Sequence, residues 1–131
     1  MSTAGAPRVS VIMANLNGAA HIAAAVRSVL RQSERSLELI VSDDGSSDDS
    51  LERAAHAAAG AARHVLLRHG ARSGPAAARN RALKAARGEW IAVVDNDDAD
   101  HPERIAKLIC AAEADQADIV ADDLLTFYEE R

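Results

Sequence analysis

The chain has 131 residues, 48% of them hydrophobic, and this size and apolar content fit one domain but not two. Its 20 acidic and 15 basic side chains give a net charge of −5, which argues against nucleic acid or an anionic membrane surface as the main partner. The single cysteine, Cys110, excludes an internal disulfide and a thiolate metal site. Alanine supplies 30 residues, so we expect a compact core filled largely with small side chains.

Strands and helices are predicted to alternate along the first half of the chain. The β-branched run at 9–13 predicts a buried strand, and the apolar spacing over 19–32 predicts a helix with one buried face. A second strand is predicted over 37–41 and a second helix over 48–59. Any of the small polar residues at 42–47 can cap that second helix.

The same alternation continues in the second half. We predict a strand over 64–68 and a helix over 76–87, which has Pro75 near its first turn. The most apolar segment, 90–94, is predicted to be a strand at the centre of the sheet. A fourth helix is expected to open at Pro102, and a fifth strand is predicted over 118–121.

This order predicts an α/β fold, with a mainly parallel sheet and helices on both faces in three layers. Residues 1–7 precede the first strand and are expected to form a flexible N-terminus. Ligands bind to such sheets at the carboxyl ends of the strands. The polar loops at 15–18, 43–49 and 95–100 each follow a strand directly, so we expect them to converge on one site.

The acidic residues after the fourth strand suggest a metal site. Asp95 and Asp97 are two residues apart, and in extended backbone both side chains would point the same way, which suits Mg²⁺ or Mn²⁺. Water and substrate phosphates usually complete the coordination of such an ion. The alternative is that these acids stabilise the N-terminus of the helix near Pro102, an interpretation that fits Asp100 best.

Several sequence motifs occur together and in order, including Ser-Asp-Asp-Gly-Ser-Ser and Asp-Asn-Asp-Asp. They lie in the segments 9–17, 39–48, 78–83 and 88–98. In this order they resemble the signatures of family 2 glycosyltransferases, which are inverting enzymes with the Rossmann-like glycosyltransferase A (GT-A) fold. The resemblance covers the chain from residue 8 and implies a nucleotide-sugar-binding domain over 8–131.

The resemblance also implies roles for individual side chains. Asp97 is the expected metal ligand, and Asp95 is expected at the metal or the ribose, with Asn96 beside them at the nucleotide sugar. Asp44 corresponds to the carboxylate that reads the nucleobase. Arg79 corresponds to an arginine near the donor phosphates, although a helix-surface arginine is an equal alternative.

Two further positions, Ala14 and Asn17, are expected to line the base and ribose pocket. The family usually has proline and an aromatic residue in this first loop, where this chain has Ala14 and Leu16, so an aromatic contact to the base is not expected. Four other basic residues are assigned to solvent: Arg72, Arg81, Lys84 and Arg87.

No general base is identified. The resemblance places the acceptor-binding part and the catalytic carboxylate beyond Arg131, and no motif marks Asp122 or Asp123 as the base. The first prediction is therefore a donor domain that binds a nucleotide-diphosphate sugar, with a UDP-sugar favoured. With Mg²⁺ or Mn²⁺, it would serve inverting transfer of a hexosyl group to a hydroxyl of a saccharide or lipid-linked acceptor.

Three alternatives remain open. One is a catalytically incomplete nucleotide-binding module or a truncated fragment of a longer enzyme, for which self-association is expected. A sugar nucleotidyltransferase ranks lower because the loop at 15–18 lacks basic residues, and a receiver-like signalling domain lacks its acid and lysine at the expected places. The single cysteine and the lack of a signal-peptide pattern predict a cytoplasmic location, with a peripheral position at the inner face of a membrane as the alternative for a longer protein.

Overall fold

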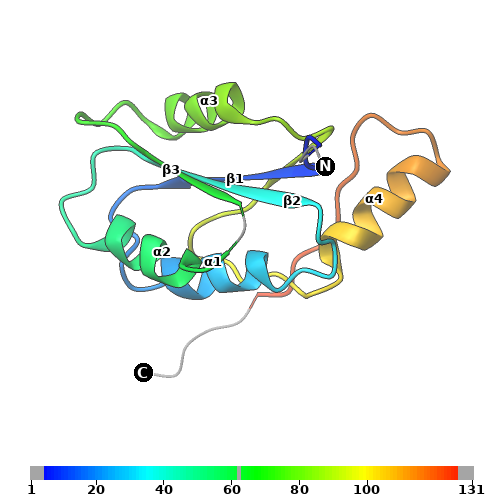
Figure 1. Ribbon diagram of the computed structural model, residues 1–131, viewed down its shortest axis with the longest axis horizontal. Helices are drawn as coiled ribbons and strands as arrows, with labels where there is room; N and C mark the ends of the chain where they lie inside the picture. Colours follow the sequence, from blue (N-terminus) through cyan, green and yellow to red (C-terminus); the bar gives the residue numbers. More distant parts are fainter. Residues whose placement is uncertain (1–4, 62, 127–131) are drawn as a thin grey trace.

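The computed structural model describes residues 5–61 and 63–126, which form a four-stranded parallel sheet with helices packed against it (Figure 1). Residues 1–4 of the N-terminal segment, which is predicted to be flexible, lie outside the described residues. The strands are β1 (Val9–Asn15), β2 (Leu37–Asp43), β3 (His64–Arg68) and β4 (Trp90–Val93), in the order β3-β2-β1-β4. The helices are α1 (Ile22–Leu30), α2 (Ser50–Ala58), α3 (Pro75–Ala85) and α4 (Arg104–Ala114).

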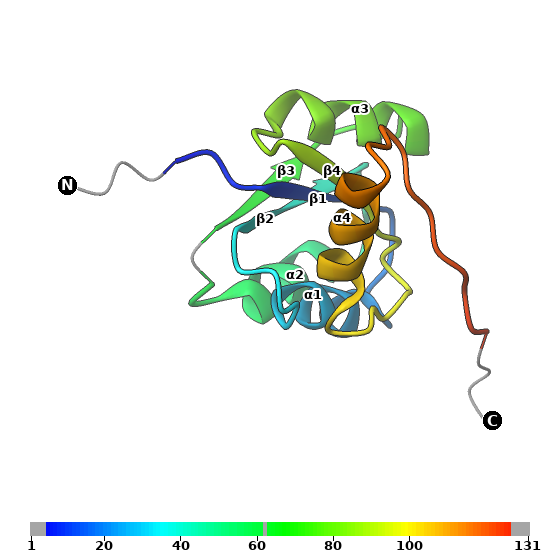
Figure 2. The same ribbon diagram turned by 90° about the vertical axis from the view of Figure 1, so that its right-hand side faces the viewer.

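Helices cover both faces of the sheet, as predicted. α3 lies on one face and α1 and α2 on the other, while α4 lies beside β4 (Figures 1 and 2). The two longest helices among the described residues, α3 and α4, have 11 residues each, and no described helix could cross a bilayer. The three-layer α/β architecture is therefore confirmed.

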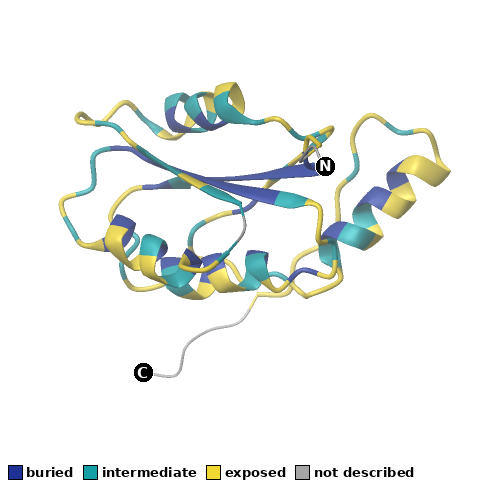
Figure 3. Ribbon diagram, viewed as in Figure 1, coloured by how far each residue is buried: buried dark blue, intermediate teal, exposed yellow. Residues whose placement is uncertain are grey.

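The side chains of the two middle strands alternate between two packed regions. Val11, Met13 and Val41 join the larger cluster with residues of α1, α2 and α4. Ile12 and Ile40 point to the other face, where they pack against α3. Figure 3 shows the resulting band of buried residues along the middle of the sheet. The buried alanines confirm the expected small-residue packing: Ala25, Ala54, Ala58, Ala78, Ala82 and Ala112.

The prediction that 90–94 forms the central strand is wrong. β1 occupies the middle of the sheet with β2 and β4 on its two sides, and β4 is an edge strand of the described sheet. Two of its side chains, Ile91 and Val93, are 41% and 50% exposed. An apolar run marks a surface that favours burial, but strand order depends on the crossover through α3, which carries the chain past β2 and β1.

The predicted strand at 118–121 is also absent from the described residues. This segment follows α4 without pairing to the sheet, and Ile119 is 87% exposed. The apolar pair Ile119 and Val120 suggests a strand locally, but strand formation also requires a neighbouring chain to supply hydrogen bonds.

A buried carboxylate fixes the start of β4 against β1. Ser10 Oγ donates to Glu38 Oε1 at 2.6 Å, and the backbone N–H of Arg87 donates to the same oxygen at 2.8 Å. Burial opposes ionisation of Glu38, but these hydrogen bonds and the Arg87 charge outweigh it and hold the pKa of Glu38 below its usual value. A Cβ at Gly88 would lie 2.5 Å from the Ser10 nitrogen, so this close approach requires glycine.

Candidate functional site

One amide joins the three loops that were expected to converge. Asn15, at the end of β1, is 1% exposed. Its Nδ2 donates to Asp43 Oδ1 and to Ser50 Oγ, both at 2.8 Å, and its Oδ1 accepts from Asn96 Nδ2 at 2.8 Å. Asn15 was not among the predicted site residues. The available signal was its position as a polar residue that ends an otherwise apolar strand.

The turn after β2 is held from within and from a neighbouring loop. Asp43 Oδ1 accepts from Ser46 Oγ at 2.6 Å, and Asp43 Oδ2 accepts from the Ser46 backbone N–H at 3.1 Å. Gly45 has a φ of +85°, and a Cβ there would lie 3.2 Å from the backbone of Ala71 and Arg72. Glycine therefore allows this turn and the 70–74 loop to approach each other.

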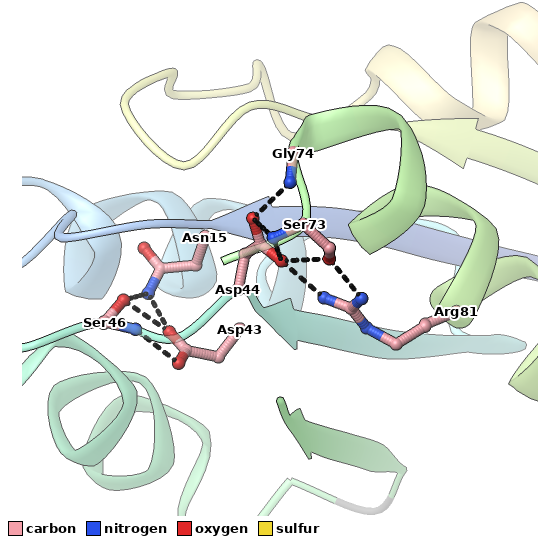
Figure 4. Close-up of polar contacts among 7 residues, drawn as sticks. All are labelled: Asn15, Asp43, Asp44, Ser46, Ser73, Gly74 and Arg81. Atoms are coloured by element: carbon pink, nitrogen blue, oxygen red, sulfur yellow. Dashed lines mark hydrogen bonds and ion pairs between the residues drawn. The ribbon is translucent and has the colours of Figure 1, made fainter. Parts of the chain in front are cut away.

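Asp44 lies beneath that loop and is surrounded by donors, as Figure 4 shows. Its Oδ1 accepts from Ser73 Oγ at 2.7 Å and from Arg81 Nη2 at 2.8 Å, and its Oδ2 accepts from the Gly74 N–H at 2.8 Å. The hydrogen bonds from Ser73 and Arg81 hold the pKa of Asp44 far below its usual value. Asp44 is therefore a fixed, ionised carboxylate.

The assignment of Arg81 to solvent is wrong, because its guanidinium reaches from α3 to Asp44. Arg87 is partly engaged as well, with Nε 3.7 Å from a Glu38 oxygen. Arg72 and Lys84 are exposed, as predicted. Helical periodicity carries no information on the loop that the Arg81 side chain meets.

The predicted pocket residues of the first loop have separate surroundings. Asn17 has a φ of +53°, and its Oδ1 accepts from the Ser47 N–H at 2.8 Å, so it ties the first loop to the second. Ala14 is half-buried in β1 opposite Ser42 of β2. The Asp48 carboxylate adds a further link by accepting from the Ala19 N–H at 3.1 Å.

The acidic residues after β4 form a compact group of carboxylates. Oxygens of Asp95, Asp97 and Asp98 lie within 4.8 Å of one another, and all three residues are exposed. They meet through a turn, closed by the hydrogen bond from the Asp98 N–H to the Asp95 carbonyl at 3.3 Å, so the predicted extended backbone at Asp95 and Asp97 is wrong. Arg79 Nη2 lies 3.4 Å from Asp95 Oδ1.

This acidic turn has the chemistry of a site for a hard cation. Burial and the charges of Asp97 and Asp95 raise the pKa of Asp98 and so disfavour its ionised form. Among the described residues, none donates a hydrogen bond to the carboxylate of Asp97 or Asp98. Clustered oxygen ligands of this type fit Mg²⁺ or Mn²⁺.

A cavity of about 550 Å³ adjoins the acidic turn, between α4 and the segment that follows it. Arg104 at its wall donates to both oxygens of Asp122, at 2.8 and 3.0 Å, and to Asp100 at 3.1 Å. The Arg104 hydrogen bonds outweigh partial burial and lower the pKa of Asp122. Asp122 is therefore engaged by arginine, and Asp123 lines the same cavity.

Comparison with known proteins adds independent information. The family model "Glycosyl transferase family 2" matches residues 10–131. The succinoglycan biosynthesis protein ExoO of Rhizobium meliloti is 39% identical over 118 residues, which cover 90% of this chain and 33% of ExoO. The chain thus spans about a third of the length of this relative.

Solved structures agree with this match. The S. aureus protein TarS in complex with UDP is 27% identical, with a TM-score of 0.75 over 82% of this chain and 32% of TarS; it is also known in complex with UDP-GlcNAc. The mannosyltransferase PcManGT of Pyrobaculum calidifontis, in complex with GDP-Man and Mn²⁺, is 27% identical, with a TM-score of 0.74 over 80% of this chain and 32% of that protein. The predicted family and fold are confirmed: the chain belongs to glycosyl transferase family 2 and has a GT-A-like fold.

Proposed function

We propose that this chain is the donor-binding part of an inverting glycosyltransferase that binds a nucleotide-diphosphate sugar through Mg²⁺ or Mn²⁺. The observation that carries the proposal is the exposed carboxylate group of Asp95, Asp97 and Asp98, which lies on the same edge of the sheet as Asp44. A cation with open coordination positions can bridge this group to a diphosphate. The TarS complex with UDP and the PcManGT complex with GDP-Man and Mn²⁺ support this chemistry.

Each predicted residue has a distinct task in this proposal. Asp97, with Asp95, would hold the metal ion, which when bound offsets negative charge on the departing nucleoside diphosphate. Arg79 is already beside Asp95 and is placed to share charge between that carboxylate and a phosphate. Asp44 would accept a hydrogen bond from the nucleobase.

Three residues are proposed to shape the space between base and metal. Ala14 leaves room at the end of β1, and Asn17 fixes the first loop against the second. Asn96 donates to Asn15 and so holds the acidic turn at a set distance from β1. Uracil is the favoured base and a hexosyl group the favoured sugar, in line with the TarS complex with UDP-GlcNAc.

Binding and deprotonation of the acceptor are proposed to use residues other than those that bind the nucleotide sugar and the metal. An acceptor hydroxyl of a saccharide or lipid-linked saccharide would attack the anomeric carbon on the face opposite the nucleotide, with loss of its proton to a base. Asp122 is a poor candidate for that base, because Arg104 binds both of its oxygens and lowers its pKa. Its engagement by Arg104 favours a role in shaping the cavity beside the acidic turn.

Calorimetric titration with UDP tests the donor half directly. We expect UDP to bind in the presence of Mn²⁺ and to bind much more weakly in EDTA. Asp97→Ala should lower the affinity on the order of 100-fold, because it removes a direct ligand of the ion. Asp115→Ala changes an exposed acid at the end of α4 and is the matched control. Metal-independent binding, or equal affinity in the two variants, would contradict the proposal.

A further inference from the structure

The carboxylate of Asp44 is fully occupied by donors of the protein itself. Besides the contacts to Ser73 Oγ, Gly74 and Arg81, the Ser73 N–H lies 3.0 and 3.1 Å from its two oxygens. A carboxylate has about four lone-pair positions for hydrogen bonds. A nucleobase can therefore reach Asp44 only by replacing one of these donors.

The donors around Asp44 are not equally held. Ser73 is an exposed residue of the 70–74 loop, and the next residue, Gly74, has a φ of +95°. Arg81 is anchored on α3, whose residues Ala78 and Ala82 are fully buried against the sheet. The hydrogen bond from Arg81 joins two opposite charges and is stronger than one from a serine hydroxyl. The Ser73 hydroxyl also accepts from Arg81 Nη1 at 2.7 Å, but it belongs to the exposed loop, whereas Arg81 is held by its helix. We therefore take the Ser73 hydroxyl as the donor that can leave, while Arg81 and the backbone N–H groups of Ser73 and Gly74 remain.

We propose that Arg81 is a positioning residue for nucleobase recognition, which fixes the Asp44 carboxylate while the Ser73 hydroxyl is exchanged for a ring N–H of the base. This inference rests on the proposed function and deepens it. The backbone of Asp44 is held separately, because its N–H donates to the Asn15 carbonyl at 2.9 Å. Loss of Arg81 should therefore loosen the side chain of Asp44, which keeps only the N–H donors of Ser73 and Gly74 once the hydroxyl has left, and should leave its backbone in place.

The arrangement selects a chemical class of base. A fixed carboxylate accepts a hydrogen bond from a ring N–H, which uracil presents at N3 and guanine at N1. Cytosine presents an unprotonated nitrogen at N3, which the carboxylate repels. We therefore expect the ratio of UDP affinity to CDP affinity to depend on Arg81.

The test compares Arg81→Met, Arg81→Lys and Lys84→Met by calorimetry with UDP and CDP in Mn²⁺. Lys84 is an exposed cation on the same helix and serves as the matched control. Arg81→Met should weaken UDP binding about tenfold, the cost of one charge-assisted hydrogen bond, and should move the UDP to CDP ratio toward one. Arg81→Lys should recover part of both, and Lys84→Met should match the wild type.

A pH profile adds a readout that a purely structural role would not change. Loss of Arg81 raises the pKa of Asp44 toward its usual value, so UDP binding by Arg81→Met should fall between about pH 5 and 3 while the wild type changes less. Ser73→Ala removes only the exchanged hydroxyl and should bind UDP at least as tightly as the wild type.

The possible failures are distinguishable. A wild type that binds neither UDP nor GDP with Mn²⁺ overturns the proposed function and this inference with it. A wild type that binds UDP, with Arg81→Met and Lys84→Met alike in nucleotide ratio and pH profile, overturns the inference alone. If Arg81→Met does not fold, Arg81→Lys decides by the same two readouts. Weaker UDP binding by Ser73→Ala overturns the proposed exchange.

Discussion

The two sides of the carboxyl edge of the sheet are built in opposite ways. At the ends of β1 and β2, the polar side chains of Asn15, Asp43 and Asp44 are nearly buried, and each accepts or donates several hydrogen bonds within the protein. After β4, the carboxylates of Asp97 and Asp98 are exposed and accept no hydrogen bond from the described residues. The first side is complete without a ligand, whereas the second concentrates negative charge.

The two sides therefore have different tasks: the β1–β2 side gives the base site a rigid shape, and the acidic turn gives it affinity for a cation. The β1–β2 side defines the shape of the base site before any nucleotide arrives, because its hydrogen bonds already fix each side chain. The acidic turn pays an electrostatic cost in the free protein that a divalent cation relieves. Substitutions on the first side should therefore reduce stability, while those on the second should change metal binding with little loss of stability.

The largest expected effect tests the β1–β2 side. Asn15→Ala should lower the free energy of unfolding by about 3 kcal/mol, because it leaves several buried polar partners without a hydrogen bond. Urea unfolding monitored by circular dichroism gives this value. Asn96→Ala, which loses only one contact to Asn15, should cost about 1 kcal/mol. Equal losses for the two variants would show that Asn15 is not the central contact.

The second prediction concerns the stabilisation of the folded protein by bound UDP. At a free UDP concentration about 100 times its dissociation constant in Mn²⁺, folding should be stabilised by about 2.7 kcal/mol. Thermal unfolding in matched buffers with Mn²⁺ or EDTA measures the shift. Asp97→Ala should lose most of it, whereas Asp115→Ala should keep it. An equal shift in both variants would place the ligand away from the acidic turn.

The smallest expected effect is a substitution in the acidic turn that raises the free energy of unfolding. Asp98→Asn should stabilise the metal-free protein by about 0.3–0.5 kcal/mol after solvent screening, because it removes a charge that burial and the neighbouring carboxylates both disfavour. The folded-state pKa of Asp98 is raised, so its destabilising contribution is present at neutral pH and fades as the pH falls below that pKa. Urea unfolding in EDTA at pH 7 and pH 4 should show the difference shrinking. Destabilisation by Asp98→Asn at pH 7 would contradict the electrostatic account.

Local sequence patterns predicted a large part of this fold. The strand at 64–68 has the predicted bounds, and all four strand and helix pairs are present in order. Periodicity records which face of an element is apolar, so it found the elements and the inward face of α1, where Ile22, Val26 and Val29 are buried. It could not place β4 at the edge, because strand order is decided by crossovers between elements distant in sequence.

The same limit explains what was found and missed in the site. The acidic residues were recognised because Asp95 and Asp97 are close in sequence, even though a turn and not an extended strand brings them together. The contact between Asn15 and Asn96 joins residues 81 positions apart, and that of Arg81 with Asp44 joins residues 37 apart. Such pairs depend on tertiary packing, which a single sequence does not reveal.

The Asn15 amide has a consequence for recombination between relatives. Because it forms hydrogen bonds with Asp43 on one side and Asn96 on the other, the loops after β1, β2 and β4 depend on one another and should be exchanged together. A chimera that takes the acidic turn from another parent, and keeps the rest of this chain, separates that turn from the amide that holds it. Crossovers that carry positions 15, 43 and 96 from the same parent preserve the contact and should give the folded chimeras in which donor preference can be exchanged.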